Sequence, residues 1–116
     1  MPAKLVVALG GLLLCVSAAA AELHKGRLQG EQVARYVVPA RAGQRLDVVL
    51  KSGSRSAYFN VQAEHASAAE FIGSIKGAHY RGAAATDGSY TITVYLMRHA
   101  ARRNAVADYQ LQVDVQ

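Results

Sequence analysis

Apolar residues recur at every second position along most of this chain, and this spacing limits the folds it can adopt. Alternation of this kind is typical of half-buried strands, with one face on a core and the other in water. Two runs show it best, Tyr90–Met97 and the C-terminal stretch from Tyr109. Their expected inward residues are Tyr90, Ile92, Val94 and Leu96 in the first run, and Tyr109, Leu111, Val113 and Val115 in the second.

Shorter alternating segments separated by turn sequences complete the expected fold. Ala42-Gly43-Gln44 precedes one expected strand, Ser52-Gly53-Ser54 follows it, and Asp87-Gly88 opens another. Turn signals recur at intervals short enough for a sandwich rather than a βαβ fold. Ala63–Ile72 is rich in alanine and glutamate and is expected to be a loop containing one helical turn. Further strands are expected at Leu23–Leu28, Val33–Val38, Leu46–Lys51, Ala57–Gln62 and His79–Ala84. The pattern predicts an all-β fold, an antiparallel β-sandwich or jelly roll of seven to eight strands.

Residues 1–21 have the organisation of a secretory signal peptide, and residues 22–116 are expected to form a single β-sandwich domain. A positive start ending at Lys4 precedes the apolar run Leu5–Val16, which is shorter than a bilayer span. Small residues follow, and we expect cleavage near Ala21 and a periplasmic or secreted mature protein. Cys15 is the one cysteine of the chain and lies in this leader, so the mature protein is expected to contain no disulfide.

Residue types that often carry catalysis or bind metals are present without the usual grouping. No HExxH, CxxC or Gly-x-Ser-x-Gly motif occurs in the sequence. The histidines lack metal-ligand spacing; they are His24, His65, His79 and His99. The sequence therefore gives no support for an enzyme and predicts neither a cofactor nor a metal.

The segment Arg98–Asn104 concentrates positive charge between two of the best predicted strands. Arg98 and Arg102 are four residues apart, so one turn of helix would direct both guanidinium groups to the same side. Arginine is suited to bidentate capture of a carboxylate or phosphate. His99 and Arg103 belong to the same segment and extend its basic character. The alternative interpretation is a solvated basic loop that keeps a sheet edge from pairing.

Parts of the sequence resemble the bacterial periplasmic inhibitors of g-type lysozyme. The stretches that carry this resemblance are Gly88–Val94, Met97–Arg103 and Tyr109–Val113. Upstream, Ala42–Val48 resembles a strand entry that these inhibitors share with prepeptidase C-terminal-type β-sandwiches. The resemblance covers most of the chain after the leader and is most specific at the Arg-x-x-Ala-Arg loop.

The resemblance implies that the protein protects peptidoglycan by plugging the substrate cleft of a g-type lysozyme with loop residues. Arg98 and Arg102 match the two family arginines implicated in that contact. Because a lysozyme cleft holds a catalytic carboxylate, an arginine inserted there would occupy the cleft and exclude the sugar. The family pattern has a tyrosine at the turn between the first two strands. This chain has Glu31 there, an acidic group that could pair with a basic rim on the partner.

The basic charge of the chain, formally +5, leaves a second function open. This alternative is a non-enzymatic module that binds anionic envelope glycans or lipopolysaccharide, with Tyr58, Tyr95 and arginines on an open sheet face. No nucleic-acid motif accompanies the charge, so no nucleic-acid partner is expected. We also expect no insertion of the mature chain into a membrane. A long exposed edge strand could pair two copies as a homodimer.

Overall fold

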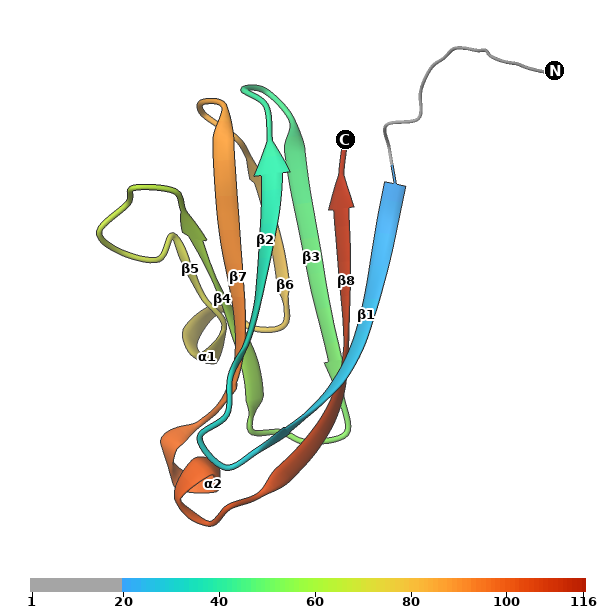
Figure 1. Ribbon diagram of the computed structural model, residues 1–116, viewed down its shortest axis with the longest axis vertical. Helices are drawn as coiled ribbons and strands as arrows, with labels where there is room; N and C mark the ends of the chain where they lie inside the picture. Colours follow the sequence, from blue (N-terminus) through green and yellow to red (C-terminus); the bar gives the residue numbers. More distant parts are fainter. Residues whose placement is uncertain (1–19) are drawn as a thin grey trace, which may run out of the picture.

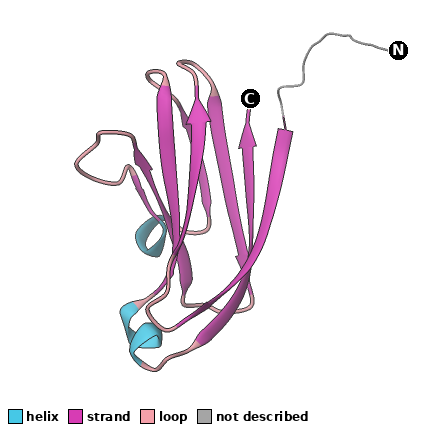
Figure 2. Cartoon of the chain, in the orientation of Figure 1, coloured by secondary structure: helices cyan, strands magenta, loops and turns pink. Residues whose placement is uncertain are grey.

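The computed structural model describes residues 20–116, which form two four-stranded antiparallel sheets packed face to face (Figure 1, Figure 2). The first sheet has the order β1 (Ala20–Gln29), β8 (Val106–Val115), β3 (Arg45–Ser52), β6 (His79–Ala83). The second has the order β2 (Ala34–Ala40), β7 (Gly88–Leu96), β4 (Ala57–Ala63), β5 (Phe71–Ile72). The two short helices are α1 (Gly73–Lys76) and α2 (Arg98–Arg102).

The eight antiparallel strands confirm the predicted all-β class. Successive strands alternate between the two sheets at almost every connection, which is the strand order of a jelly roll. The predicted signal peptide falls largely on residues 1–19, outside the described residues. β1 begins at Ala20, so cleavage after Ala21 would leave Glu22–Gln29 in the mature strand.

The inward residues of the central strands form the core between the sheets. The expected inward residues of β7 are all buried, as are Tyr109, Leu111 and Val113 on β8. The alternate apolar residues of β3 and β4 are buried as well: Leu46, Val48, Leu50, Ala57, Phe59 and Val61. Val115 is half-buried rather than buried, because it is the last residue of β8 and lies at the margin of the core. Each large side chain that is fully buried stabilises the fold by about 1.5–3 kcal/mol. Alternation along the sequence therefore supplies most of the core.

The helical turn lies later than the sequence predicted. Instead of falling within Ala63–Ile72, it is α1, which begins at Gly73. Phe71 is buried and its ring stacks on that of Phe59 at a centroid distance of 5.0 Å, which holds β5 extended beside β4. At Gly73, an added Cβ would lie 2.4 Å from the carbonyl oxygen of Phe59. A glycine therefore allows the chain to turn directly against β4.

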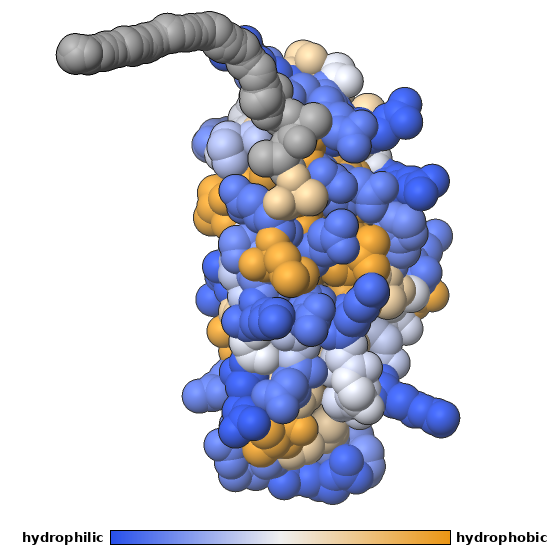
Figure 3. All heavy atoms as spheres, turned by 90° about the vertical axis from the view of Figure 1, so that its right-hand side faces the viewer, coloured by the Kyte–Doolittle hydropathy of each residue, from blue (hydrophilic) through white to orange (hydrophobic). Residues whose placement is uncertain are grey.

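β1 and β2 are edge strands of the two sheets and are linked to each other by side chains. The rings of His24 and Tyr36 lie 4.6 Å apart, and the hydroxyls of Tyr36 and Tyr109 are hydrogen-bonded at 2.5 Å. Leu23 on β1 and Val37 on β2 are 55% and 66% exposed. On the side of the molecule drawn in Figure 3, hydrophilic surface interrupts the apolar patches. Homodimer formation through such an edge stays a prediction.

Candidate functional site

The basic segment predicted from the sequence forms α2, a single helical turn at one end of the sandwich (Figure 1). The Met97 N–H donates to the carbonyl oxygen of Ser56 at 2.9 Å, which anchors the start of the turn to the β3–β4 connection. Ala100 is 1% exposed and packs against the core. Asn104 follows the helix in the left-handed conformation, with φ of 56°, which asparagine tolerates well. The backbone of α2 is therefore fixed at its start, middle and end.

Arg98 and Arg102 lie together, as their spacing predicted. With Ala101 between them on the same side of α2, they line a hollow of about 600 Å³. Both arginines are exposed, and within residues 20–116 neither forms an ion pair. The hollow therefore presents two guanidinium groups that are not engaged in an ion pair within the described residues.

Glu31 lies at the same hollow, although it is far from α2 in the sequence. It occupies the turn between β1 and β2, which is closed by the Gln32 N–H donating to the Gln29 carbonyl at 3.2 Å. The Gly30 N–H donates to the Ala105 carbonyl at 2.9 Å, so the turn is joined to the chain just beyond α2. The structure thus places an exposed carboxylate beside the two arginines without an ion pair to either.

His99 and Arg103 lie outside this hollow. The Arg103 guanidinium donates to Nε2 of His99 at 3.2 Å, so these two side chains engage each other on α2. The sequence grouped five candidate residues, and the structure divides them into two sets. Arg98, Arg102 and Glu31 line the hollow, whereas His99 and Arg103 form a separate pair on the exposed surface of the turn.

Tyr95 and Met97 also line the hollow, and sequence reasoning did not include them in the arginine site. Tyr95 lies on the outer face of β7, and its hydroxyl donates to Oδ1 of Asn60 at 3.0 Å. Its ring centroid is 6.3 Å from that of Tyr58 on β4. Met97 is 40% exposed. In the sequence, only its position could have indicated that Tyr95 belongs to this site, because it points outward on the strand that leads directly into Arg98.

An ion pair between β1 and β8 lies near the same end of the molecule. Nε of Arg27 donates to Oδ1 of Asp108 at 2.7 Å. This hydrogen bond and the attraction between the charges lower the pKa of Asp108 and raise that of Arg27.

In residues 20–116 no cluster of three or more His, Cys, Asp or Glu side chains could hold a metal ion. The described chain also has no helix with both the length and the apolar character needed to cross a membrane.

Fold and site together define a binding protein: a jelly-roll scaffold that presents paired arginines on a fixed turn. The structure is similar to Aeromonas hydrophila PliG, a periplasmic lysozyme inhibitor of g-type lysozyme, with 37% sequence identity and a TM-score of 0.74. The match covers 84% of this chain and 88% of that chain. The chain therefore belongs to the PliG family of periplasmic inhibitors of g-type lysozyme.

Two further solved structures share the fold at lower identity. Salmonella Typhimurium PliG is 20% identical with a TM-score of 0.66, over 83% of this chain and 87% of that chain. A mutant of the Escherichia coli PliG is 16% identical with a TM-score of 0.65, over 84% of this chain and 89% of that chain. No protein-family model and no curated protein sequence matches the chain.

Proposed function

We propose that this protein is an exported inhibitor of g-type lysozyme and that α2 enters the substrate cleft of the enzyme. The observation that carries the proposal is the placement of Arg98 and Arg102 on one side of a fixed, solvent-exposed turn. The family relationship to Aeromonas hydrophila PliG supports g-type lysozyme as the partner. It also supports a periplasmic location after removal of residues 1–21.

Arginine chemistry suits this target. Glycoside hydrolases act through paired carboxyl groups, so the cleft of a lysozyme offers an acidic group at its centre. A guanidinium fork can bind a carboxylate through two parallel hydrogen bonds. Because both arginines are without an ion pair inside the described chain, no internal contact needs to break before they bind. The inhibitor would compete with the substrate by binding the catalytic carboxylate.

The packing of α2 lowers the cost of binding. Ala100 is buried, and backbone hydrogen bonds tie both ends of the turn to neighbouring connections. A segment held in its binding conformation loses little conformational entropy when it enters a cleft. Ala101 lies between the two arginines, and its short side chain lets the turn approach a partner closely.

The direct test is inhibition of a purified g-type lysozyme by wild-type protein and by Arg98→Ala and Arg102→Ala. Truncating one partner of a buried charge pair typically costs about 2–5 kcal/mol, or about 30-fold or more in the inhibition constant. Arg41→Ala is the matched control, because Arg41 is exposed on the β2–β3 connection, away from α2. Full inhibition by both α2 variants would show that this turn does not enter the cleft.

Partner choice and processing need separate measurements. A panel of c-, g- and i-type lysozymes should show inhibition of the g-type enzyme. Mass determination of the exported protein should show an N-terminus close to Glu22. The size of the mature protein in solution tests whether the exposed edges of β1 and β2 pair two copies.

A further inference from the structure

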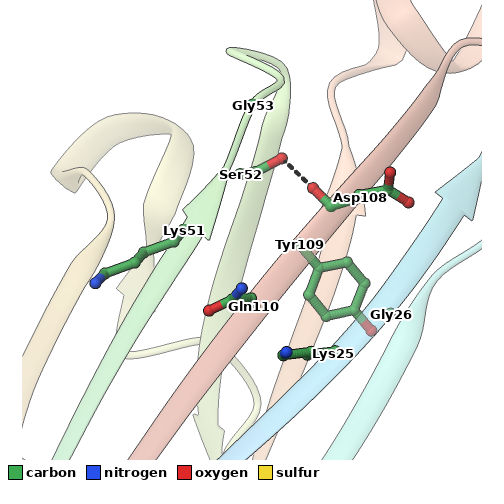
Figure 4. A pocket seen from close by; sticks show the side chains of 8 residues that line it. All are labelled: Lys25, Gly26, Lys51, Ser52, Gly53, Asp108, Tyr109 and Gln110. Carbon is green, nitrogen blue, oxygen red and sulfur yellow. Dashed lines mark hydrogen bonds between the residues drawn. The ribbon is translucent and has the colours of Figure 1, made fainter.

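A second hollow, of about 550 Å³, lies on the β1–β8–β3 part of the first sheet and shares no lining residue with the α2 hollow (Figure 4). The side chains that matter for its chemistry are Lys25 on β1, Gln110 and Asp108 on β8, and Lys51 and Ser52 on β3. The backbone of Gly53 completes one end. The proposed inhibitory site uses none of these residues.

Strand register places the two lysines on either side of Gln110. Gln110 is the Cα partner of Lys25 on β1 and of Lys51 on β3. Because neighbouring strands lie about 4.8 Å apart, the two lysine Cα atoms are separated by roughly 10 Å. In Figure 4 both lysine side chains extend to the same side of the strands as Gln110, whereas the ring of Tyr109 turns the other way. Two flexible ammonium groups therefore flank one amide side chain.

The remaining polar groups of this hollow already have partners. The carboxylate of Asp108 accepts hydrogen bonds from Arg27 at 2.7 and 3.4 Å. The Ser52 hydroxyl donates to the carbonyl oxygen of Asp108 at 2.6 Å. Neither Lys25 nor Lys51 forms an ion pair within the part of the chain that the structure describes. The hollow thus keeps two uncompensated positive charges beside the donor and acceptor groups of an amide.

We infer that this hollow binds a phosphate-bearing sugar. A lysine ammonium is a compact point charge suited to phosphate, and two of them can share the oxygens of one phosphate group. The Gln110 amide offers both a donor and an acceptor to sugar hydroxyls. The volume falls within the range of about 300–1,000 Å³ that small-molecule sites occupy and exceeds what a bare phosphate ion fills. The site is independent of lysozyme inhibition.

The test is an NMR titration of the mature protein with glucose 1-phosphate, with glucose and inorganic phosphate as separate arms. Glucose 1-phosphate should shift the backbone amides of Gly53 and Gln110, and this binding should weaken as salt is added. The Lys25→Gln/Lys51→Gln double variant should bind at least about tenfold more weakly, because it loses two charged hydrogen-bond donors. Lys76→Gln on α1 is the matched control and should bind as wild type.

Three results would overturn the assignment. They are equal binding by the double variant, inorganic phosphate binding as tightly as the sugar ester, or no shift at these amides with any probe. Vesicles carrying a phosphorylated glycolipid distinguish a membrane source from a free sugar phosphate, and binding to either supports the site. Inhibition of lysozyme by the double variant should equal that of wild type, so failure here is distinct from failure of the inhibitor proposal. Because both lysines are exposed, the double variant should unfold at the wild-type temperature.

Discussion

The backbone N–H of Gly30 donates to the carbonyl oxygen of Ala105 at 2.9 Å, and this hydrogen bond joins the β1–β2 turn to the chain that leaves α2. It brings Glu31 to the hollow lined by Arg98 and Arg102. Two segments far apart in the sequence therefore build one charged surface. The geometry of the proposed inhibitory site depends on this junction as much as on α2 itself.

Substituting Gly30 by alanine should destabilise the protein and weaken inhibition. Gly30 has φ of +63°, and an added Cβ would lie 2.6 Å from Oδ1 of Asn104. We expect the free energy of unfolding to fall by about 1–2 kcal/mol, measured by urea denaturation. Gly53→Ala is the control, because a Cβ there meets no atom within 4 Å, and it should change stability by less than about 0.5 kcal/mol. Equal stability of the two variants would contradict this account of the turn.

Replacing the α2 arginines by lysine should separate charge from geometry. Arg98→Lys and Arg102→Lys keep the positive charge and lose the planar fork that binds a carboxylate through two hydrogen bonds. We expect each lysine variant to inhibit g-type lysozyme more weakly than wild type and more strongly than the corresponding alanine variant. Inhibition constants measured side by side test this order. If the lysine variants match wild type, simple attraction between charges accounts for the contact.

Glu31→Gln should reduce the association rate with lysozyme. An exposed carboxylate at the margin of an interface contributes mainly through attraction to a basic rim, with an effect of about 0–1 kcal/mol. Surface plasmon resonance should show slower association for the variant, a difference that disappears at high salt. Faster association by the variant would instead show that Glu31 opposes the acidic cleft.

Tyr80 and Tyr109 should make the fold sensitive to alkali. Burial raises the pKa of both phenols, and hydrogen bonds with Glu70 and Tyr36, respectively, raise them further. An unfolded tyrosine ionises near pH 10, so above that pH the unfolded chain releases protons that the folded chain retains. Stability should therefore be fully present below about pH 10 and fall as the pH rises toward the raised pKa values. Urea denaturation across this range should show a shallower fall for Tyr80→Phe/Tyr109→Phe, and an unchanged slope would refute the assignment.

The carboxyl group of Asp108 should titrate below its usual range as long as Arg27 is present. The hydrogen bond from Arg27 and its charge lower the pKa of Asp108, so their contribution to stability is present above the unfolded value of about 3.9. It is lost as the pH falls through the lowered folded value. An NMR titration of Asp108 should show a higher pKa in Arg27→Gln than in wild type. Lys76→Gln removes a distant positive charge and should leave the titration as it is in wild type.

The all-β class could be predicted from the sequence because the side chains of a strand alternate between its two faces. The run from Tyr90 to Leu96 has one apolar face, and that face is buried in the structure. The pairing of Arg98 with Arg102 was equally local, since residues four apart on a helical turn share one side. The turn predicted within Ala63–Ile72 was misplaced, because the buried ring of Phe71 favours pairing with β4 over local helix formation.

By itself, then, the sequence determined the strand faces, the antiparallel class and the spacing of the two arginines, because each depends on neighbours a few residues apart. Tertiary structure alone decided that Glu31 and Tyr95 share a hollow with those arginines and that His99 and Arg103 do not. It also decided that Lys25 and Lys51 flank Gln110. These placements depend on strand order and on which turns meet at the end of the sandwich. Both result from packing the two sheets together, and no short stretch of sequence encodes them.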